Sequence, residues 1–188
     1  MTSLNVEVTP KQLELLHELV PNASAMALLV NPANSVRAES NTREAQVAAR
    51  RLGLKLHIVH ASGEREFDVA LASSVQLRAR ALVIGSDSLF FSRSRQLGAL
   101  ALRHAIPAIA PYREFAAAGG LMSYGTNNTN QFRQVGIYTG RILKGEKPVD
   151  LPVEQAVKLN LIINLKTARA LGLTVPLIMQ MTADEVIE

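Results

Sequence analysis

The sequence predicts an open, doubly wound α/β fold, with helices on both faces of a parallel sheet in a Rossmann-like, three-layer arrangement. Short apolar runs alternate along the chain with longer segments of helical periodicity. Glycine and proline stand between these segments, where turns are expected. Four strand-then-helix units follow one another, and such a series favours parallel pairing through right-handed crossovers.

The predicted helices have recognisable ends. Thr9 is interpreted as the N-cap of the first helix, with Pro10 at its first helical position and Pro21 closing it. Gly53 and Gly172 are expected just past the ends of two later helices, because glycine accepts the left-handed conformation there. Helices are predicted over residues 10–20, 36–52, 92–104, 130–144 and 166–171, with one more capped by Ser62, a short one before Gly119, and another in the tail from Thr174 to Glu188.

The strands are predicted from short apolar segments, and the continuous apolar run at residues 26–30 is typical of a strand that is buried on both faces. They cover residues 26–30, 54–60, 81–84, 107–110, 121–124 and 159–163. Aromatic residues make up only 4% of the chain and tryptophan is absent, so the core must be aliphatic. Residues 145–152 are polar and contain proline, which indicates a surface connection.

Composition excludes or disfavours several functions. The net charge of +4 raises the question of nucleic-acid binding, but the arginines are scattered and no run of five like charges occurs. The chain has no cysteine, which excludes disulfides, thiolate catalysis and cysteine-based zinc sites. The first residues, MTSLNVEVTPKQ, lack a basic n-region and an apolar h-region, so they predict no signal peptide. No apolar stretch is long enough for a transmembrane helix.

Polar loops follow three of the predicted strands, at residues 31–35, 85–91 and 111–115. Ligands of open α/β sheets bind beyond the carboxyl ends of the strands. Because the carboxyl ends of parallel strands meet at one edge of the sheet, these loops form the predicted binding edge.

Asp87 is the strongest candidate in these loops. It lies just past a buried strand, between Ser86 and Ser88. A carboxylate at this place suits a ligand ammonium or hydroxyl group, but serine and aspartate are also favoured helix N-caps, and both interpretations stay open. Phe90 and Phe91 point in different directions on a helix, so one is expected in the core and the other at a pocket wall.

The other two loops offer Asn31, Asn34 and Tyr112. The asparagines suit either a ligand or a turn. Tyr112 follows the fourth strand, where a tyrosine can stack on a ligand and donate a hydrogen bond, or lie partly buried at the surface.

No catalytic set is visible in the sequence. His57 and His60 would lie on opposite faces of one strand, which is poor metal-binding geometry. No GxSxG, P-loop or GxGxxG motif occurs. A carboxylate pair for acid/base chemistry would require Asp87 and Glu114 to meet across two loops. The sequence therefore predicts a protein that is not an enzyme and has no metal or cofactor.

Four segments carry a resemblance to a known family: ALLVNPAN at 27–34, residues 81–125, GRILKGEKPVDLPVEQ at 140–155 and LNLIINLKTARALGLTVP at 159–176. They resemble ABC-transporter substrate-binding proteins of the branch related to tryptophan- and tyrosine-binding lipoproteins, which have the type I periplasmic-binding-protein fold. The resemblance runs over essentially the whole chain.

The resemblance implies a periplasmic, two-lobed clamp that binds a small organic solute, an amino acid or an aromatic acid, between its lobes. Closure of the hinge would then present the closed form to a membrane permease. In such proteins Asp87 would bind the ligand's amino group, and Tyr124, at the hinge crossing, would also reach the ligand. The positions implied to face the cleft are Asn31, Asn34, Ser86, Asp87, Phe90 and Tyr112.

Family members carry a signal peptide and a first lobe of about a hundred residues before the segment that matches Leu13 onward. The resemblance thus implies that this chain lacks most of its first lobe. Residues 1–20 would form a hinge-proximal helix and 21–118 the ligand-binding second lobe. Residues 119–152 would cross to the first lobe, and 153–188 would return and form the tail.

Without a first lobe, apolar side chains of the crossing segment would lack a partner. We expect this segment to fold back on the second lobe, or a second copy of the chain to cover it, in a homodimer that buries Leu121 to Lys144. The side chains concerned are Phe132, Val135, Tyr138 and Ile142.

Two other functions are compatible with the same fold. A ligand-sensing regulatory domain is the first alternative, and the absence of a helix-turn-helix ahead of the fold disfavours it. An α/β enzyme of two-lobed design, such as a racemase, is disfavoured because no nucleophile or base pair stands at the strand ends.

Overall fold

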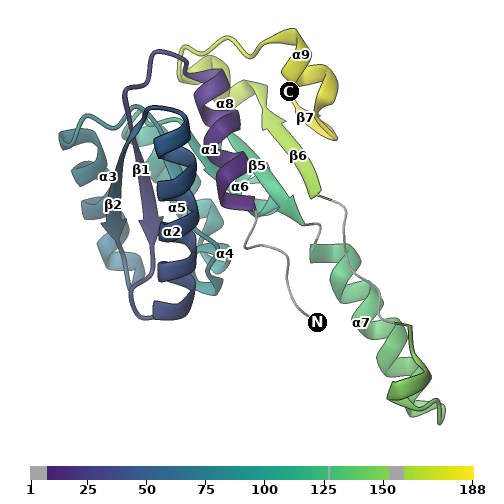
Figure 1. Ribbon diagram of the computed structural model, residues 1–188. Coiled ribbons are helices and arrows are strands. Elements are labelled where there is room, and N and C mark those ends of the chain that lie inside the picture. The colour runs from purple at the N-terminus through teal and green to yellow at the C-terminus, as the bar shows by residue number, and fades with distance from the viewer. Residues whose placement is uncertain (1–7, 127, 153–158) are drawn as a thin grey trace.

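A computed structural model describes residues 8–126, 128–152 and 159–188 of the chain. The described residues form one seven-stranded sheet in the order β2-β1-β3-β4-β5-β6-β7 (Figure 1). Neighbouring strands pair in parallel, except β5 and β6, which are antiparallel. The predicted open α/β sheet is thereby confirmed. The strands are β1 (Ala25–Val30), β2 (Lys55–His60), β3 (Leu82–Ile84), β4 (Ala108–Ala110), β5 (Met122–Thr126), β6 (Leu159–Asn164) and β7 (Glu185–Ile187).

Helices cover both faces of this sheet. One face carries α1 (Val8–Leu19), α2 (Ser35–Arg51), α8 (Leu165–Ala170) and α9 (Leu177–Thr182). The other face carries α3 (Phe67–Gln76), α4 (Ser88–Ser92), α5 (Ser94–Arg103) and α6 (Arg113–Ala117). Short 3₁₀ turns stand at Glu64–Glu66 and Pro148–Asp150, and α7 (Asn128–Leu143) follows β5.

Each face of the sheet has its own hydrophobic core, because successive side chains of a strand point to opposite faces. Met26 and Leu28 of β1 enter the core under α1 and α2, whereas Ala27 and Leu29 enter the core under α3 and α5. All six residues of β1 are therefore buried, which explains the continuous apolar run in the sequence. Burying one such aliphatic side chain contributes about 1.5–3 kcal/mol.

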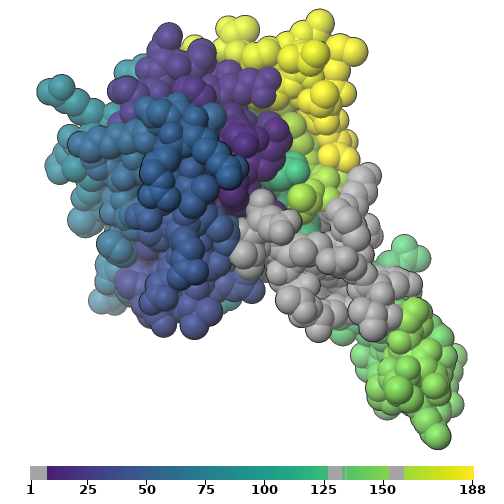
Figure 2. All heavy atoms as spheres, viewed as in Figure 1, coloured from purple at the N-terminus to yellow at the C-terminus, as the bar shows by residue number. Residues whose placement is uncertain are grey.

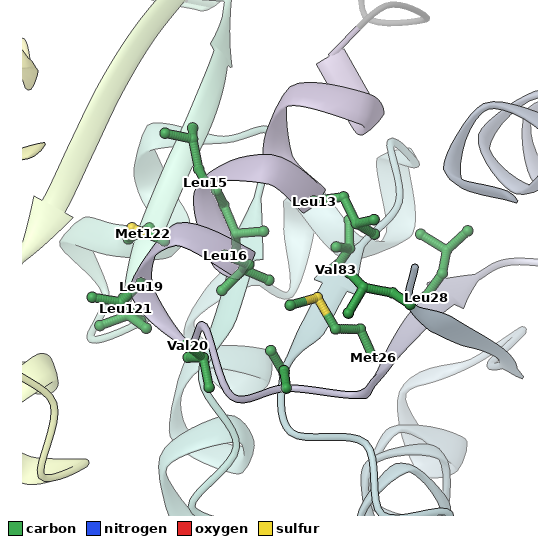
Figure 3. Close-up of a cluster of buried hydrophobic side chains, with 14 of the residues drawn as sticks. Leu13, Leu15, Leu16, Leu19, Val20, Met26, Leu28, Val83, Leu121 and Met122 are labelled. Carbon is green, nitrogen blue, oxygen red and sulfur yellow. The ribbon is translucent and has the colours of Figure 1, made fainter. Parts of the chain in front are cut away.

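Helix α1 is an integral part of the first core. Figure 3 shows Leu13 and Leu16 of this helix directed toward Met26 and Val83 of the sheet. Gln12 adds a polar link, since its Nε2 donates a hydrogen bond to the carbonyl oxygen of Tyr124 in β5 at 2.8 Å. The helix therefore belongs to the same folded unit as the strands.

Several element boundaries differ from the sequence expectation. Thr9 lies inside α1, which begins at Val8, so it is not the N-cap that we expected. Ser62 does not cap α3 either, because the chain first makes a 3₁₀ turn, and the Ser62 N–H donates to the Glu66 carboxylate. The tail contains the expected short helix, and also β7, which pairs in parallel with β6. The sequence did not predict β7, because a strand of three residues is too short to show a recognisable alternation of apolar and polar residues.

Helix α7 projects away from the sheet instead of folding back on it (Figures 1 and 2). Apolar side chains on it are exposed, with Val135 at 44%, Ile137 at 46% and Leu143 at 82%. The side chain of Phe132, which was expected among them, lies outside the described residues. Leu121, at the start of the predicted crossing segment, is buried in the core under α1. The unpartnered apolar surface therefore belongs to α7 itself.

Replacing Leu16 by alanine tests whether α1 is needed for the stability of this lobe. Leu16 is fully buried, so Leu16→Ala is expected to lower the free energy of unfolding by about 2–5 kcal/mol through lost burial and a new cavity. Urea denaturation measures the loss. The matched control is Leu102→Ala on α5, where the side chain is 41% exposed and the expected loss is below about 1 kcal/mol. Equal losses in the two variants would contradict this role of α1.

Candidate functional site

The three polar loops predicted from the sequence meet at one edge of the sheet. They follow β1, β3 and β4, which are adjacent in the sheet and run in parallel. Hydrogen bonds join side chains from all three loops, and Asp87 takes part in each of these contacts. The strand-end loops therefore form a single cluster around this residue.

The Asp87 carboxylate accepts three hydrogen bonds. Asn31 donates from its Nδ2 to Oδ1 at 3.0 Å, and Asn34 donates from its Nδ2 to Oδ2 at 2.9 Å. The backbone N–H of Leu89 donates to Oδ1 at 2.9 Å, which makes Asp87 the N-cap of α4. The capping interpretation of Asp87 is confirmed, and the same carboxylate also holds both asparagines in place.

The electrostatics of this cluster are unusual for a buried acid. Asp87 is only 6% exposed, and it forms no ion pair within the described part of the chain. All three of its donors are neutral. A carboxylate offers about four acceptor positions, and neutral donors occupy three of them here.

Tyr112 holds the backbone of Asp87. Its hydroxyl accepts a hydrogen bond from the Asp87 N–H at 2.6 Å and donates one to the Asp87 carbonyl oxygen at 2.8 Å. The ring packs edge-on against Phe91, with 5.0 Å between centroids. Burial raises the pKa of the Tyr112 phenol above its usual value, against smaller opposing effects of hydrogen bonds to Ser86 and to the Asp87 backbone. Tyr112 therefore positions the loop after β3, and its hydroxyl already donates one hydrogen bond to the Asp87 backbone and accepts another from it.

Gly85 lets the loop after β3 lie close to its neighbours. A Cβ at this position would lie 2.9 Å from the Leu29 carbonyl oxygen and 2.9 Å from the Asn41 Nδ2. No side chain fits into that space, because one of these neighbours is backbone. Asn41 was not predicted as part of the site, although it falls on the apolar stripe of α2 with Ala45 and Ala48. A polar residue on such a stripe is the signal that would have identified it.

Two predicted site residues lie elsewhere. Phe90 is 1% exposed and packs edge-on against Phe67 in the core under α3, so it cannot face a ligand in this structure. Of the phenylalanine pair, Phe91 is the one beside Tyr112. Tyr124 points to the α1 side of the sheet, where it lines a hollow of about 430 Å³ between α1 and α9. The structure therefore brings together Asn31, Asn34, Ser86, Asp87 and Tyr112, but not Phe90 or Tyr124.

Two further findings bear on function. Within the residues that the structure describes, no three histidine, aspartate or glutamate side chains come together in a way that could hold a metal ion. None of the described helices combines the length and the apolar character needed to cross a bilayer.

An open sheet that gathers its polar strand-end loops at one edge is consistent with a lobe of the type I periplasmic-binding-protein class. Solved structures support this class. The ABC domain from Streptococcus pneumonia in complex with L-Trp is 22% identical, with a TM-score of 0.81 over 96% of this chain and 62% of that chain. A conserved domain protein from Vibrio cholerae is 23% identical, with a TM-score of 0.79 over 95% of this chain and 60% of that one.

A third similar structure is the ligand-free, open form of a substrate binding protein with adhesive properties from Clostridium difficile. It is 24% identical, with a TM-score of 0.68 over 100% of this chain and 60% of that chain. At these identities the likeness shows the fold. The chain spans 60–62% of the length of these solved proteins.

The chain belongs to the family of ABC transporter substrate binding proteins, because the model of that family matches residues 2–187. The family resemblance stated from the sequence is confirmed. A search of curated proteins gave no match.

Replacing Tyr112 by phenylalanine tests its positioning role. Tyr112→Phe keeps the ring beside Phe91 but leaves both backbone groups of Asp87 without their partner, so the free energy of unfolding is expected to fall by about 1–3 kcal/mol. Urea denaturation measures the change. The control is Tyr138→Phe, whose hydroxyl donates to the Pro152 carbonyl at an exposed place, with an expected effect within about 0.5 kcal/mol. If the control lost as much as Tyr112→Phe, the proposed role would be wrong.

The raised pKa of Tyr112 predicts a pH dependence. The folded state favours the neutral phenol, so this contribution to stability is complete below the usual pKa of 10.0 and is lost as the pH rises through the higher pKa of the folded protein. The phenolate absorbance of the native protein should therefore show a titration step above pH 10.0. In urea, where the chain is unfolded, this step should move down to about pH 10.0. The step should be absent from Tyr112→Phe and present in Tyr138→Phe; its persistence in Tyr112→Phe would refute the assignment.

Proposed function

We propose that this chain is the ligand-binding lobe of the solute-binding component of an ABC importer, and that it binds the amino group of a small organic solute at Asp87. One observation carries the proposal. A nearly buried carboxylate stands at the carboxyl edge of the sheet, is held by three neutral donors, and has no cationic partner in the described residues. An ammonium group supplies both the charge and the donor that this carboxylate lacks.

The surroundings of Asp87 favour an amino acid over an aromatic acid without an amine. A second carboxylate brought close to Asp87 would be repelled, whereas a protonated amine would be attracted. Asn31 and Asn34 fix the direction of the carboxylate before a solute arrives, which reduces the ordering cost of binding. The aromatic rings of Phe91 and Tyr112 stand beside the same loop and offer apolar contact to a solute side chain.

The second part of the proposal is a two-lobed clamp. β5 leads directly into the projecting α7, and β6 returns antiparallel beside β5. This path fits the predicted division into a hinge-proximal helix (1–20), a ligand-binding lobe (21–118), a crossing segment (119–152) and a return (153–188). The greater length of the solved relatives also supports it. In such a clamp, the first lobe would pack against the exposed side chains of α7. In the alternative arrangement, a second copy of the chain would pack against them in a homodimer.

The clamp proposed here performs no reaction. It would capture the solute in the periplasm, close about its hinge and present the solute to a membrane permease. The alternative function predicted from the sequence, a ligand-sensing regulatory domain, has less support, since the family model that matches the chain is that of transporter substrate binding proteins.

The experiment that tests the proposal compares solutes with and without an amino group. L-tryptophan and L-tyrosine are expected to raise the melting temperature of the chain and to shift the NMR signals of the Asn31 and Asn34 side-chain amides. Indole-3-propionate, which lacks the amine, should do neither. Asp87→Asn keeps the size of the side chain but loses the charge, so it should weaken binding at least about tenfold.

The control for this experiment is Asp150→Asn, which removes the same charge at an exposed place in the 3₁₀ turn 148–150. It should bind the amino acids as the unchanged protein does. Equal binding of indole-3-propionate, or unchanged affinity in a folded Asp87→Asn variant, would overturn the assignment of Asp87. If no solute moved the Asn31 and Asn34 signals, binding by this lobe would be ruled out.

A further inference from the structure

A cationic side chain, that of Arg37, lies beside the Asp87 cluster. Helix α2 begins at the end of the sheet at which β1 ends (Figure 1). Asn34 is the N-cap residue of this helix, and its side chain donates a hydrogen bond to the Asp87 carboxylate. Arg37 follows three positions later, and residues three apart on a helix are neighbours on one face. The first turn of α2 therefore carries Arg37 on the side of Asn34.

The charge of Arg37 reaches the centre of this cluster. Burial raises the pKa of the Tyr112 phenol, and among the smaller effects the Asp87 carboxylate raises that pKa while the Arg37 guanidinium lowers it. Both charges therefore lie within electrostatic range of one hydroxyl group, and they act on it with opposite sign. They are not paired with each other, because the three donors to the Asp87 carboxylate are all neutral groups.

Arg37 differs from the other arginines in the described part of the chain. All of them are exposed except Arg37 and Arg141, which are partly buried. Arg141 pairs with the Glu146 carboxylate, whereas no ion pair joins Arg37 to a carboxylate among the described residues. A guanidinium that has lost part of its hydration gains from an anionic partner.

The place of Arg37 in its helix is unfavourable for a cation. The first turn of α2 contains no acidic residue, and a positive charge there meets the positive end of the helix dipole. The Asn34 side chain does not cap the helix. Sequences break such local preferences mainly at functional or strained sites. An anionic group held by Arg37 would remove this unfavourable interaction.

The solute proposed for Asp87 supplies such a group. This inference rests on the proposed function, in which Asp87 binds the amino group of the solute. In an α-amino acid the carboxylate is attached to the same carbon atom as the amino group, so it also comes close to Asp87, which repels it. A guanidinium binds a carboxylate through two parallel hydrogen bonds and balances its charge. We propose that Arg37 binds the carboxylate of the solute, and that the site takes a zwitterionic α-amino acid rather than an amine.

The test compares three solutes that share an indole group. L-tryptophan has both charged groups, tryptamine lacks the carboxylate, and indole-3-propionate lacks the amine. Isothermal titration calorimetry near neutral pH measures the affinity of the whole chain for each of them. L-tryptophan is expected to bind at least about tenfold more tightly than tryptamine, because it makes an additional charge-assisted contact.

Variants of Arg37 separate carboxylate binding from a structural role. Arg37→Gln removes the charge, so it should weaken the binding of L-tryptophan at least about tenfold and should not weaken that of tryptamine. Arg37→Lys keeps the charge without the planar pair of donors, so it should restore part of the loss. The matched control is Arg43→Gln, at an exposed position of the same helix, which should leave both affinities unchanged.

The outcomes distinguish this inference from the proposed function. Equal affinities of the unchanged protein for L-tryptophan and tryptamine, or an equal effect of Arg37→Gln on both solutes, would overturn the role of Arg37 and leave that of Asp87. If indole-3-propionate bound as tightly as L-tryptophan and lost its affinity in Arg37→Gln, Arg37 would be supported and the assignment of Asp87 would be wrong. If none of the three solutes bound, both assignments would be overturned.

Discussion

Three loops from three neighbouring strands are held together through one residue, Asp87. Its carboxylate binds the loop after β1 through two asparagine amides and starts α4 through the Leu89 N–H. Its backbone N–H and carbonyl oxygen both bind the Tyr112 hydroxyl, in the loop after β4. The side chain and the backbone of this one residue thus join the three loops, and its carboxylate lies buried at the carboxyl ends of the strands. These hydrogen bonds hold the Asp87 carboxylate in one direction without a ligand, and such preorganisation lowers the ordering cost of binding in general.

This cluster depends on the burial that surrounds it. The two cores hold β1, β3 and β4 in register from both faces, so the ends of these strands are fixed relative to one another. Gly85 then allows the loop after β3 to approach the Leu29 carbonyl oxygen, which no other residue type could do without moving backbone. Desolvating Asp87 is unfavourable by itself, and the hydrophobic burial beneath the edge offsets that cost.

The sequence was sufficient to predict the layers of the fold and the edge that carries the site, because both follow from local patterns. Continuous apolar runs revealed β1 and β3, and the polar loops behind them revealed Asn31, Asn34 and Asp87, whereas Tyr112 was found in the loop behind β4. It could not decide which of Phe90 and Phe91 enters the core, since that depends on how α4 sits on the sheet. It also missed β7, because this strand forms by pairing with a segment more than 20 residues earlier in the chain.

The projecting helix acts mechanically as a lever. Its 16 residues span about 24 Å at 1.5 Å per residue, and its base is the β5–β6 ladder. A rotation of about 20° at that base would carry the far end of such a rod through about 8 Å. A small change in orientation at the base would thus give a displacement larger than a side chain at the far end. The ladder beside that base consists of five residue pairs.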